Sequence, residues 1–137
     1  LGYVGLPLAV EKAKAGFCVL GFDIQPEKVD KINRGENYIG DVVPEELSTL
    51  SQNGHLSATG DFSRIRECDV LAICVPTPLD EFKQPDLSYV VNTAKTIASY
   101  LHKDMLVVLE STTYPGTTEE VLLPILSTSG LEVGKDF

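Results

Sequence analysis

The chain is poor in the residues that mark disulfide-bonded and metal-binding proteins. Its 137 residues include 3 cysteines and 2 histidines, with no CxxC pair and no metal-ligand spacing, so we expect neither a disulfide framework nor a metal site. The odd cysteine count predicts a reducing compartment, and we expect a cytoplasmic protein. Cys18 and Cys74 lie in apolar runs, where we expect buried thiols.

Positive charge and long apolar runs are also scarce. Lys and Arg total 11 against 20 Asp and Glu, and the resulting net charge of −9 opposes binding to a nucleic-acid backbone. No apolar run approaches the roughly 18 residues that a membrane span needs. Residues 1–16 lack the basic start and cleavage site of a secretory signal. We therefore expect no nucleic-acid or membrane partner, and the missing initial Met suggests a fragment.

What the sequence does contain is an alternation of two apolar patterns. Hydrophobic residues make up 43% of the chain, enough for one buried core. Segments with helical spacing alternate with short apolar runs typical of strands that are covered on both faces. This predicts a Rossmann-like α/β fold, a doubly wound and mostly parallel sheet with helices on both faces. Helices are predicted at 6–15, 26–34, 44–52, 87–101 (N-cap Asp86) and 117–126 (bent at Pro124), and strands at 17–23, 56–59, 69–75 and 105–109.

The order of the segments predicts that the first strand of this sheet is missing. Doubly wound sheets begin with a strand, yet this chain begins with a glycine turn that leads directly into a helix. Loss of a central strand would expose the edges of its neighbours and a large apolar surface. A polar loop is predicted at 79–85, after Pro76-Thr77-Pro78 ends a strand.

The first residues contain most of a dinucleotide-binding fingerprint. Gly2-Tyr3-Val4-Gly5 matches the last four positions of G-x-G-x-x-G, whose glycines let the backbone approach a pyrophosphate at a helix N-terminus. Asp23 ends the next predicted strand, 21 residues after Gly2, where a carboxylate accepts hydrogen bonds from the adenosine ribose. Such an acid repels the 2′-phosphate of NADP, so the expected cofactor is NAD. By spacing alone, an ordinary glycine turn and an exposed carboxylate remain alternatives.

Further polar residues lie just past the carboxyl ends of predicted strands, where open α/β sheets bind ligands. Thr77, Ser111 and Thr112 have hydroxyls that suit ribose, nicotinamide or phosphate oxygens, although capping of a turn is the commoner role of such groups. Glu110 either binds a ligand or is merely exposed at the sheet edge. Lys28, on the helix after Asp23, is able to reach the adenine or ribose, and a solvated helix face is its alternative role.

Five stretches, in this order along nearly the whole chain, are similar to motifs of one enzyme family. They are GYVGLPLA at 2–9, Phe22-Asp23, CVPTPL at 74–79, PDLSYV at 85–90 and ESTTYPGTTEEVLLP at 110–124. The family is that of the nucleotide-sugar 6-dehydrogenases, also called the UDP-glucose/GDP-mannose dehydrogenase family. The wording of the turns resembles most the branch that acts on UDP-N-acetylglucosamine or UDP-N-acetylmannosamine.

The resemblance implies that the C6 alcohol of a UDP-sugar is oxidised to a carboxylate while two NAD are reduced. It also implies that Thr112 helps to hold the catalytic water, and that Glu110, which some members replace, has the least secure role. The positions that match cofactor-binding residues of the family are Gly2, Tyr3, Val4, Gly5, Asp23, Lys28, Pro76, Thr77, Glu110, Ser111 and Thr112.

The same resemblance implies what the chain lacks. The family's catalytic cysteine, its UDP-sugar-binding domain and the central helix that builds the dimer lie beyond Phe137, so residues 1–137 are an NAD-binding domain truncated at both ends. We expect the fragment alone to be inactive, and the complete protein to be a homodimer or larger homo-oligomer in polysaccharide biosynthesis. UDP-glucose as the substrate, a dehydrogenase of the hydroxyacid type and a non-catalytic NAD-binding module remain alternatives.

Overall fold

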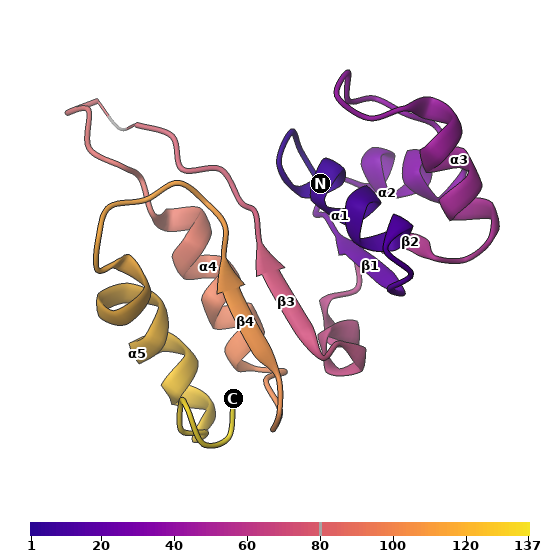
Figure 1. Cartoon of the computed structure of the whole chain (residues 1–137). Coiled ribbons are helices and arrows are strands. Elements are labelled where there is room, and N and C mark those ends of the chain that lie inside the picture. The colour runs from indigo at the N-terminus through magenta and orange to yellow at the C-terminus, as the bar shows by residue number, and fades with distance from the viewer. Residues whose placement is uncertain (80) are drawn as a thin grey trace. The chain divides into compact units, whose positions relative to one another are not determined.

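The computed structural model describes residues 1–79 and 81–137 and divides into two compact units (Figure 1). The first unit is Leu1–Phe62 and the second is Ser63–Phe137. Each contains one pair of parallel strands together with helices, which is the α/β class that the sequence predicts. No helix in the described ranges is both long enough and apolar enough to cross a membrane.

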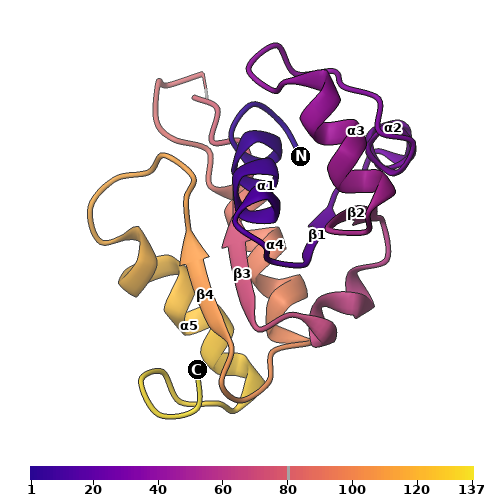
Figure 2. The same ribbon diagram turned by 45° about the vertical axis from the view of Figure 1, so that its right-hand side comes forward.

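The first unit is built on strands β1 (Val19–Phe22) and β2 (Leu56–Thr59), which run in parallel with Val19 opposite Leu56. Its helices are α1 (Gly5–Lys14), α2 (Pro26–Asn33) and α3 (Pro44–Gln52). Proline stands at the start of both α2 and α3, where its missing N–H leaves no helical hydrogen bond unmade. Helix α1 packs on α3 and on both strands, and α2 packs on β2 (Figure 2).

The core of the first unit is one cluster of buried apolar side chains. At two glycines, Gly21 and Gly35, another part of the chain packs so closely that a larger side chain would clash. A Cβ atom at Gly21 on β1 would lie 2.7 Å from Leu1 Cδ1, so Leu1 packs directly on the strand. Gly35 has a φ of +71°, and a Cβ there would lie 2.8 Å from the backbone Cα of Ser48. The buried members of the cluster are Leu6, Ala9, Val10, Ala13, Ile32, Ile39, Val42, Leu47, Leu50, Leu56 and Ala58.

The second unit is built on strands β3 (Val70–Ile73) and β4 (Leu106–Leu109), again parallel, with Val70 opposite Leu106. Helix α4 (Ser88–Ala98) lies beside α5 (Leu123–Leu126) in both ribbon views. The helix η2 (Thr118–Leu122) leads into α5, and η3 (Ser127–Ser129) follows it. The short helix η1 (Phe62–Glu67) contains the boundary between the two units.

The sheet agrees with the prediction in one respect and differs from it in another. The described strands form two separate parallel pairs, as expected of a doubly wound sheet whose first strand is missing. In the doubly wound order the first strand lies between the second and the fourth, so a chain without that strand forms two pairs. The prediction that the strands are covered on both faces is wrong for β3, where Val70 is 57% exposed and Leu71 is buried.

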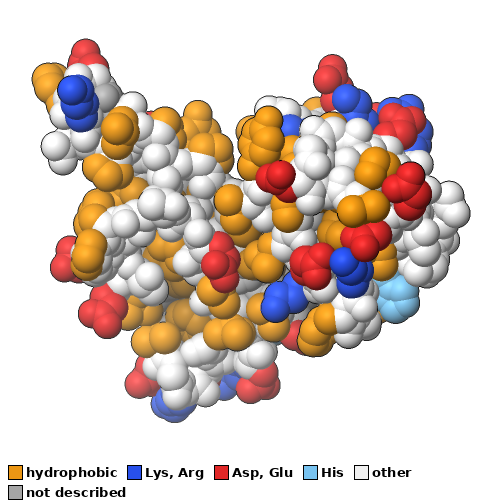
Figure 3. Space-filling model, turned by 45° about the horizontal axis from the view of Figure 1, so that its top comes forward, with side chains coloured by type: hydrophobic (Ala, Val, Ile, Leu, Met, Phe, Trp, Pro, Cys, Tyr) orange, Lys and Arg blue, Asp and Glu red, His pale blue; other side chains and the backbone are white. Residues whose placement is uncertain are grey.

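Strand β4 has an exposed apolar side chain opposite the exposed Val70 of β3. Leu106 lies opposite Val70 and is 56% exposed, so the two side chains leave the same face of the second unit's strand pair open to solvent. The buried side chains of Leu71 and Ile73 alternate with the exposed ones and cover the other face. Exposed hydrophobic side chains are visible over much of the surface in Figure 3.

Helix ends and loops account for the other differences. Helix α4 begins at Ser88, with Leu87 as N-cap in place of Asp86, although the Asp86 carboxylate still accepts a hydrogen bond of 2.8 Å from the Ser88 amide. The predicted bent helix at 117–126 is instead the π-helix η2 followed by α5, in whose first turn Pro124 interrupts no helical bond. Of the predicted loop 79–85, Asp80 lies outside the described residues.

The predicted burial of the two thiols is not observed. Cys18 is exposed because it lies just before β1, where Phe17 is exposed as well. Cys74 follows the last residue of β3 and is only half-buried. Burial and the nearby charge of Glu110 raise the pKa of the Cys74 thiol, which keeps it in the neutral, less reactive form. Among the described residues no group of three His, Cys, Asp or Glu is placed to hold a metal ion.

Candidate functional site

The glycine loop at residues 2–5 leads directly into α1. Val4 is the N-cap, and its side chain makes no capping hydrogen bond; the first turn of α1 contains no acidic residue. Tyr3 and Val4 are exposed, and a Cβ atom at Gly2 would have no neighbour within 4 Å. The loop therefore borders open space at the positive end of a helix dipole, which is an arrangement that favours an anion.

Asp23 directly follows β1 and is only 9% exposed. Its Oδ2 accepts a hydrogen bond from the amino group of Leu1, its Oδ1 accepts one of 2.9 Å from the Gln25 amide, and Lys28 Nζ lies 3.8 Å from Oδ2. Burial alone would raise the pKa of this carboxyl, but the two hydrogen bonds, the positive charge of the Leu1 amino group and the charge of Lys28 together outweigh burial and lower it. The structure thus brings Asp23, Lys28 and the start of the glycine loop together.

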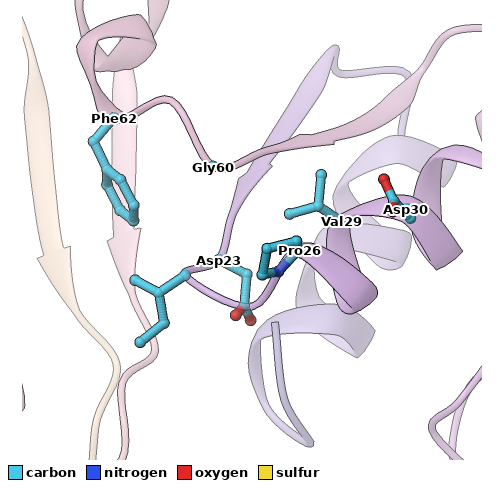
Figure 4. Close-up of a pocket in the computed structure, with 7 residues that line it drawn as sticks. Asp23, Pro26, Val29, Asp30, Gly60 and Phe62 are labelled. Carbon is cyan, nitrogen blue, oxygen red and sulfur yellow. The ribbon is translucent and has the colours of Figure 1, made fainter.

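A cavity of about 350 Å³ lies against Asp23 (Figure 4). One side of it comes from the end of β1 and from α2, and the other from the segment after β2. The Phe62 ring, whose centroid lies 5.7 Å from that of Phe22, contributes to the second side. Apolar walls beside a carboxylate suit a purine nucleoside, whose base is flat and whose ribose hydroxyls are donors. The lining residues are Asp23, Ile24, Pro26, Val29, Asp30, Gly60 and Phe62.

Only Asp23 among these lining residues was identified from the sequence. Phe62 and Gly60 follow the end of β2, where the rule that ligands bind past strand ends also applies, but the run 56–59 is short and signals a strand only weakly. No pattern in the sequence predicts that Val29 lines the cavity, because the packing of α2 decides which of its side chains face the cavity.

In the second unit, the turns that follow β3 and β4 are joined by hydrogen bonds. Thr77 Oγ1 donates to the carbonyl oxygen of Thr112 at 2.7 Å. Ser111 Oγ donates to the carbonyl oxygen of Val75 at 2.8 Å. The predicted residues Thr77, Ser111 and Thr112 therefore do lie together, and the hydroxyl hydrogens of Thr77 and Ser111 hold the turns in place. The side chains of Pro76 and Glu110, next to these turns, are exposed.

Tyr38 is half-buried in the first unit, and no sequence pattern points to it. Its hydroxyl donates a hydrogen bond of 2.8 Å to the carbonyl oxygen of Leu1, the residue before the glycine loop. Burial and the nearby charge of Asp23 raise the pKa of Tyr38 to about 12, so the hydroxyl is protonated and available as a donor at neutral pH. No periodicity or motif in the sequence signals this contact, because residues 1 and 38 meet only through the tertiary fold.

Comparison with known proteins supplies independent observations. Residues 1–137 match the family described as "UDP-glucose/GDP-mannose dehydrogenase family, NAD binding domain". The chain is 41% identical to UDP-N-acetyl-D-glucosamine 6-dehydrogenase of Pseudomonas aeruginosa over 138 residues, which cover 100% of the chain and 32% of that protein. It is 39% identical to UDP-N-acetyl-D-mannosamine dehydrogenase of Pyrococcus horikoshii, covering 100% of the chain and 33% of that protein.

A solved structure extends the comparison to the fold. The crystal structure of a ternary complex of GDP-mannose dehydrogenase from Pseudomonas aeruginosa matches 100% of the chain and 33% of that enzyme, with a TM-score of 0.95 and 34% identity. This match confirms the predicted Rossmann-like fold. The chain spans about a third of the length of the curated relatives that it matches.

Proposed function

We propose that the chain is the cofactor-binding part of a UDP-sugar 6-dehydrogenase, since it belongs to the UDP-glucose/GDP-mannose dehydrogenase family and corresponds to the NAD-binding domain of that family. NAD is the cofactor of this domain.

The residues of the first unit fit the adenosine diphosphate portion of NAD. The glycine loop, with its open space at Gly2 and uncapped helix start, suits the pyrophosphate. The Asp23 carboxylate, whose lowered pKa keeps it ionised, suits the ribose hydroxyls, and the cavity beside it suits the adenine. The single observation that carries this assignment is a buried, ionised carboxylate that borders both the loop and the cavity.

The roles of the remaining predicted residues rest on the resemblance to the family. Lys28, 3.8 Å from Asp23, balances the carboxylate charge and reaches toward the adenosine. Thr77 and Ser111, fixed by their hydrogen bonds to backbone carbonyls, offer backbone amides and oxygen lone pairs to the nicotinamide side of the cofactor. Thr112 helps to hold the catalytic water, and Pro76 and Glu110 border the same turns. When bound, NAD accepts the hydride from the sugar C6 carbon.

We further propose that the substrate is a UDP-N-acetyl-hexosamine, as the names of the relatives in Pseudomonas and Pyrococcus suggest. Because the chain spans a third of those relatives, we place the catalytic cysteine and the sugar-binding domain in the remaining part of the protein. That part would also build a homodimer or larger oligomer. A cytoplasmic location and a role in polysaccharide synthesis agree with a nucleotide-sugar substrate.

The test is NADH formation by the complete protein that carries this chain. UDP-glucose, UDP-N-acetylglucosamine and UDP-N-acetylmannosamine are each supplied with NAD or with NADP, and NADH absorbance is recorded. We expect two NADH per molecule of one N-acetylated sugar, with NAD and not with NADP. Residues 1–137 alone should oxidise no sugar. Binding of NAD by the complete protein without oxidation of any sugar would favour a non-catalytic module, and oxidation of UDP-glucose alone would move the substrate to the other branch.

A further inference from the structure

The loop between α2 and α3 places one hydroxyl against the start of the glycine loop. Tyr38 packs on the core of the first unit, and Lys31 Nζ lies 5.9 Å from the centroid of its ring. The Tyr38 hydroxyl donates a hydrogen bond of 2.8 Å to the carbonyl oxygen of Leu1. A half-buried hydroxyl that is directed at a backbone carbonyl is an anchor for that backbone.

The segment that carries Tyr38 is itself braced, so the hydroxyl has a fixed position. The Asn37 side chain donates to the carbonyl oxygens of Ile39 and Val42 at 2.9 and 2.7 Å and accepts a hydrogen bond of 3.0 Å from the Ile39 amide. Gly35, with its positive φ, packs against the backbone of Ser48 on α3. The Asn37 hydrogen bonds and the Gly35 packing contact together fix the backbone before and after Tyr38.

Leu1 is held at two further points. Its nitrogen donates to Asp23, and its side chain fills the space next to Gly21 on β1. The residue directly before Gly2 is thus fixed through its nitrogen, its side chain and, by Tyr38, its carbonyl oxygen. The last of these is the contact nearest to the peptide bond that joins Leu1 to Gly2.

We propose that Tyr38 is a positioning residue for the cofactor, which fixes the glycine loop in the conformation that receives the NAD pyrophosphate. This inference rests on the proposed function. Tyr38 does not itself contact the cofactor: it restricts the peptide plane between Leu1 and Gly2, and so restricts the direction in which the loop amides point. A loop held in its binding conformation loses less conformational entropy when the anion binds.

The test compares Tyr38→Phe with the unaltered complete protein. Phenylalanine keeps the ring and its packing and removes only the hydroxyl. We expect affinity for NAD and for ADP-ribose to fall about 3- to 10-fold, the range expected for one lost hydrogen bond. Affinity for adenosine, which has no pyrophosphate, should change by less than about twofold. Calorimetry gives the first two affinities and a chemical-shift titration gives the third.

Two variants serve as controls. Tyr100→Phe removes a hydroxyl from a half-buried tyrosine of the second unit, whose ring contacts Arg66, and should leave the NAD affinity unchanged. Lys31→Met removes the cation beside the Tyr38 ring but keeps the hydroxyl, so it should keep NAD affinity within about twofold. Hydrogen exchange of the backbone amides of residues 2–5 should become faster in Tyr38→Phe and in neither control.

The outcomes separate this inference from the proposed function. If the unaltered protein binds no NAD, the proposed function fails. If it binds NAD and Tyr38→Phe binds equally well, the positioning role fails and the proposed function stands. A similar loss of affinity for adenosine and for ADP-ribose, together with a lower melting temperature, would indicate a purely structural role and overturn the inference. An equal loss in Lys31→Met would assign the effect to the ring and overturn it as well.

Discussion

The two units hold their predicted ligand-binding residues by different physical means. In the first unit a buried carboxylate, Asp23, is kept ionised by hydrogen bonds and by Lys28 beside a cavity with apolar walls. In the second unit the predicted residues are hydroxyls that hold two exposed turns together through backbone carbonyls. A buried charge is sensitive to substitution and to pH, whereas each neutral hydroxyl bond between the turns contributes only about 1 kcal/mol and does not titrate near neutral pH.

The largest effect on stability is expected at Gly35 in the first unit, where the structure has no space for a side chain. Gly35→Ala adds a Cβ at 2.8 Å from the Ser48 Cα and forces an unfavourable φ of +71°. We expect it to lower the free energy of unfolding by about 3 kcal/mol or more. Gly54→Ala is the matched control, because Gly54 has a φ of +79° and open space around it, and it should cost about 1 kcal/mol. Urea denaturation compares the two, and equal costs would contradict the steric argument.

Replacement of the buried carboxylate should have the next largest effect. Asp23→Asn replaces the charged carboxylate, whose oxygens accept the ribose hydrogen bonds, by a neutral amide, and we expect NAD affinity to fall about 10- to 100-fold. Asp30→Asn changes an exposed carboxylate in the wall of the same cavity and should change NAD affinity by less than about threefold. Calorimetric titration with NAD measures both. If the two variants lose affinity equally, net charge rather than Asp23 itself governs binding.

The pH dependence of stability sharpens the same comparison. The pKa of Asp23 is lowered in the folded chain, so its ionised form stabilises the fold above the ordinary carboxyl pKa, and this contribution is lost as the pH falls through the lowered value. Asp23→Asn should therefore flatten the fall in melting temperature below a pH of about 4. Asp86→Asn in the second unit should flatten it less, because the Asp86 carboxylate interacts near the surface, where solvent weakens its hydrogen bond to Ser88.

The smallest effect is expected in the turns of the second unit. Thr77→Val removes the hydrogen bond to the Thr112 carbonyl and should cost about 1 kcal/mol of stability or less. Thr128→Val removes a bond of the same length, 2.7 Å, to the Ile125 carbonyl near the end of α5, and should cost a similar amount. A rise in the KM for NAD in Thr77→Val alone would point to a cofactor contact in addition to the turn.

The sequence predicts the elements whose ends carry local signals. Pro44 and the apolar spacing after it place α3 at its observed bounds, and the short strand at 56–59 is observed unchanged as β2. Asp23 was found because a strand-end acid at the right distance from a glycine loop is a local pattern. The exposed faces of Val70 and Leu106 and the cavity wall at Phe62 depend on what packs against them, which periodicity does not contain.

The close contact between Leu1 and Gly21 links two positions that are distant in sequence. Gly21 needs no special backbone conformation. It is small because the Leu1 side chain occupies the volume where its Cβ would stand. A larger side chain at position 21 would therefore require the Leu1 side chain to move or to be smaller, and we expect the sizes of these two residues to covary among relatives.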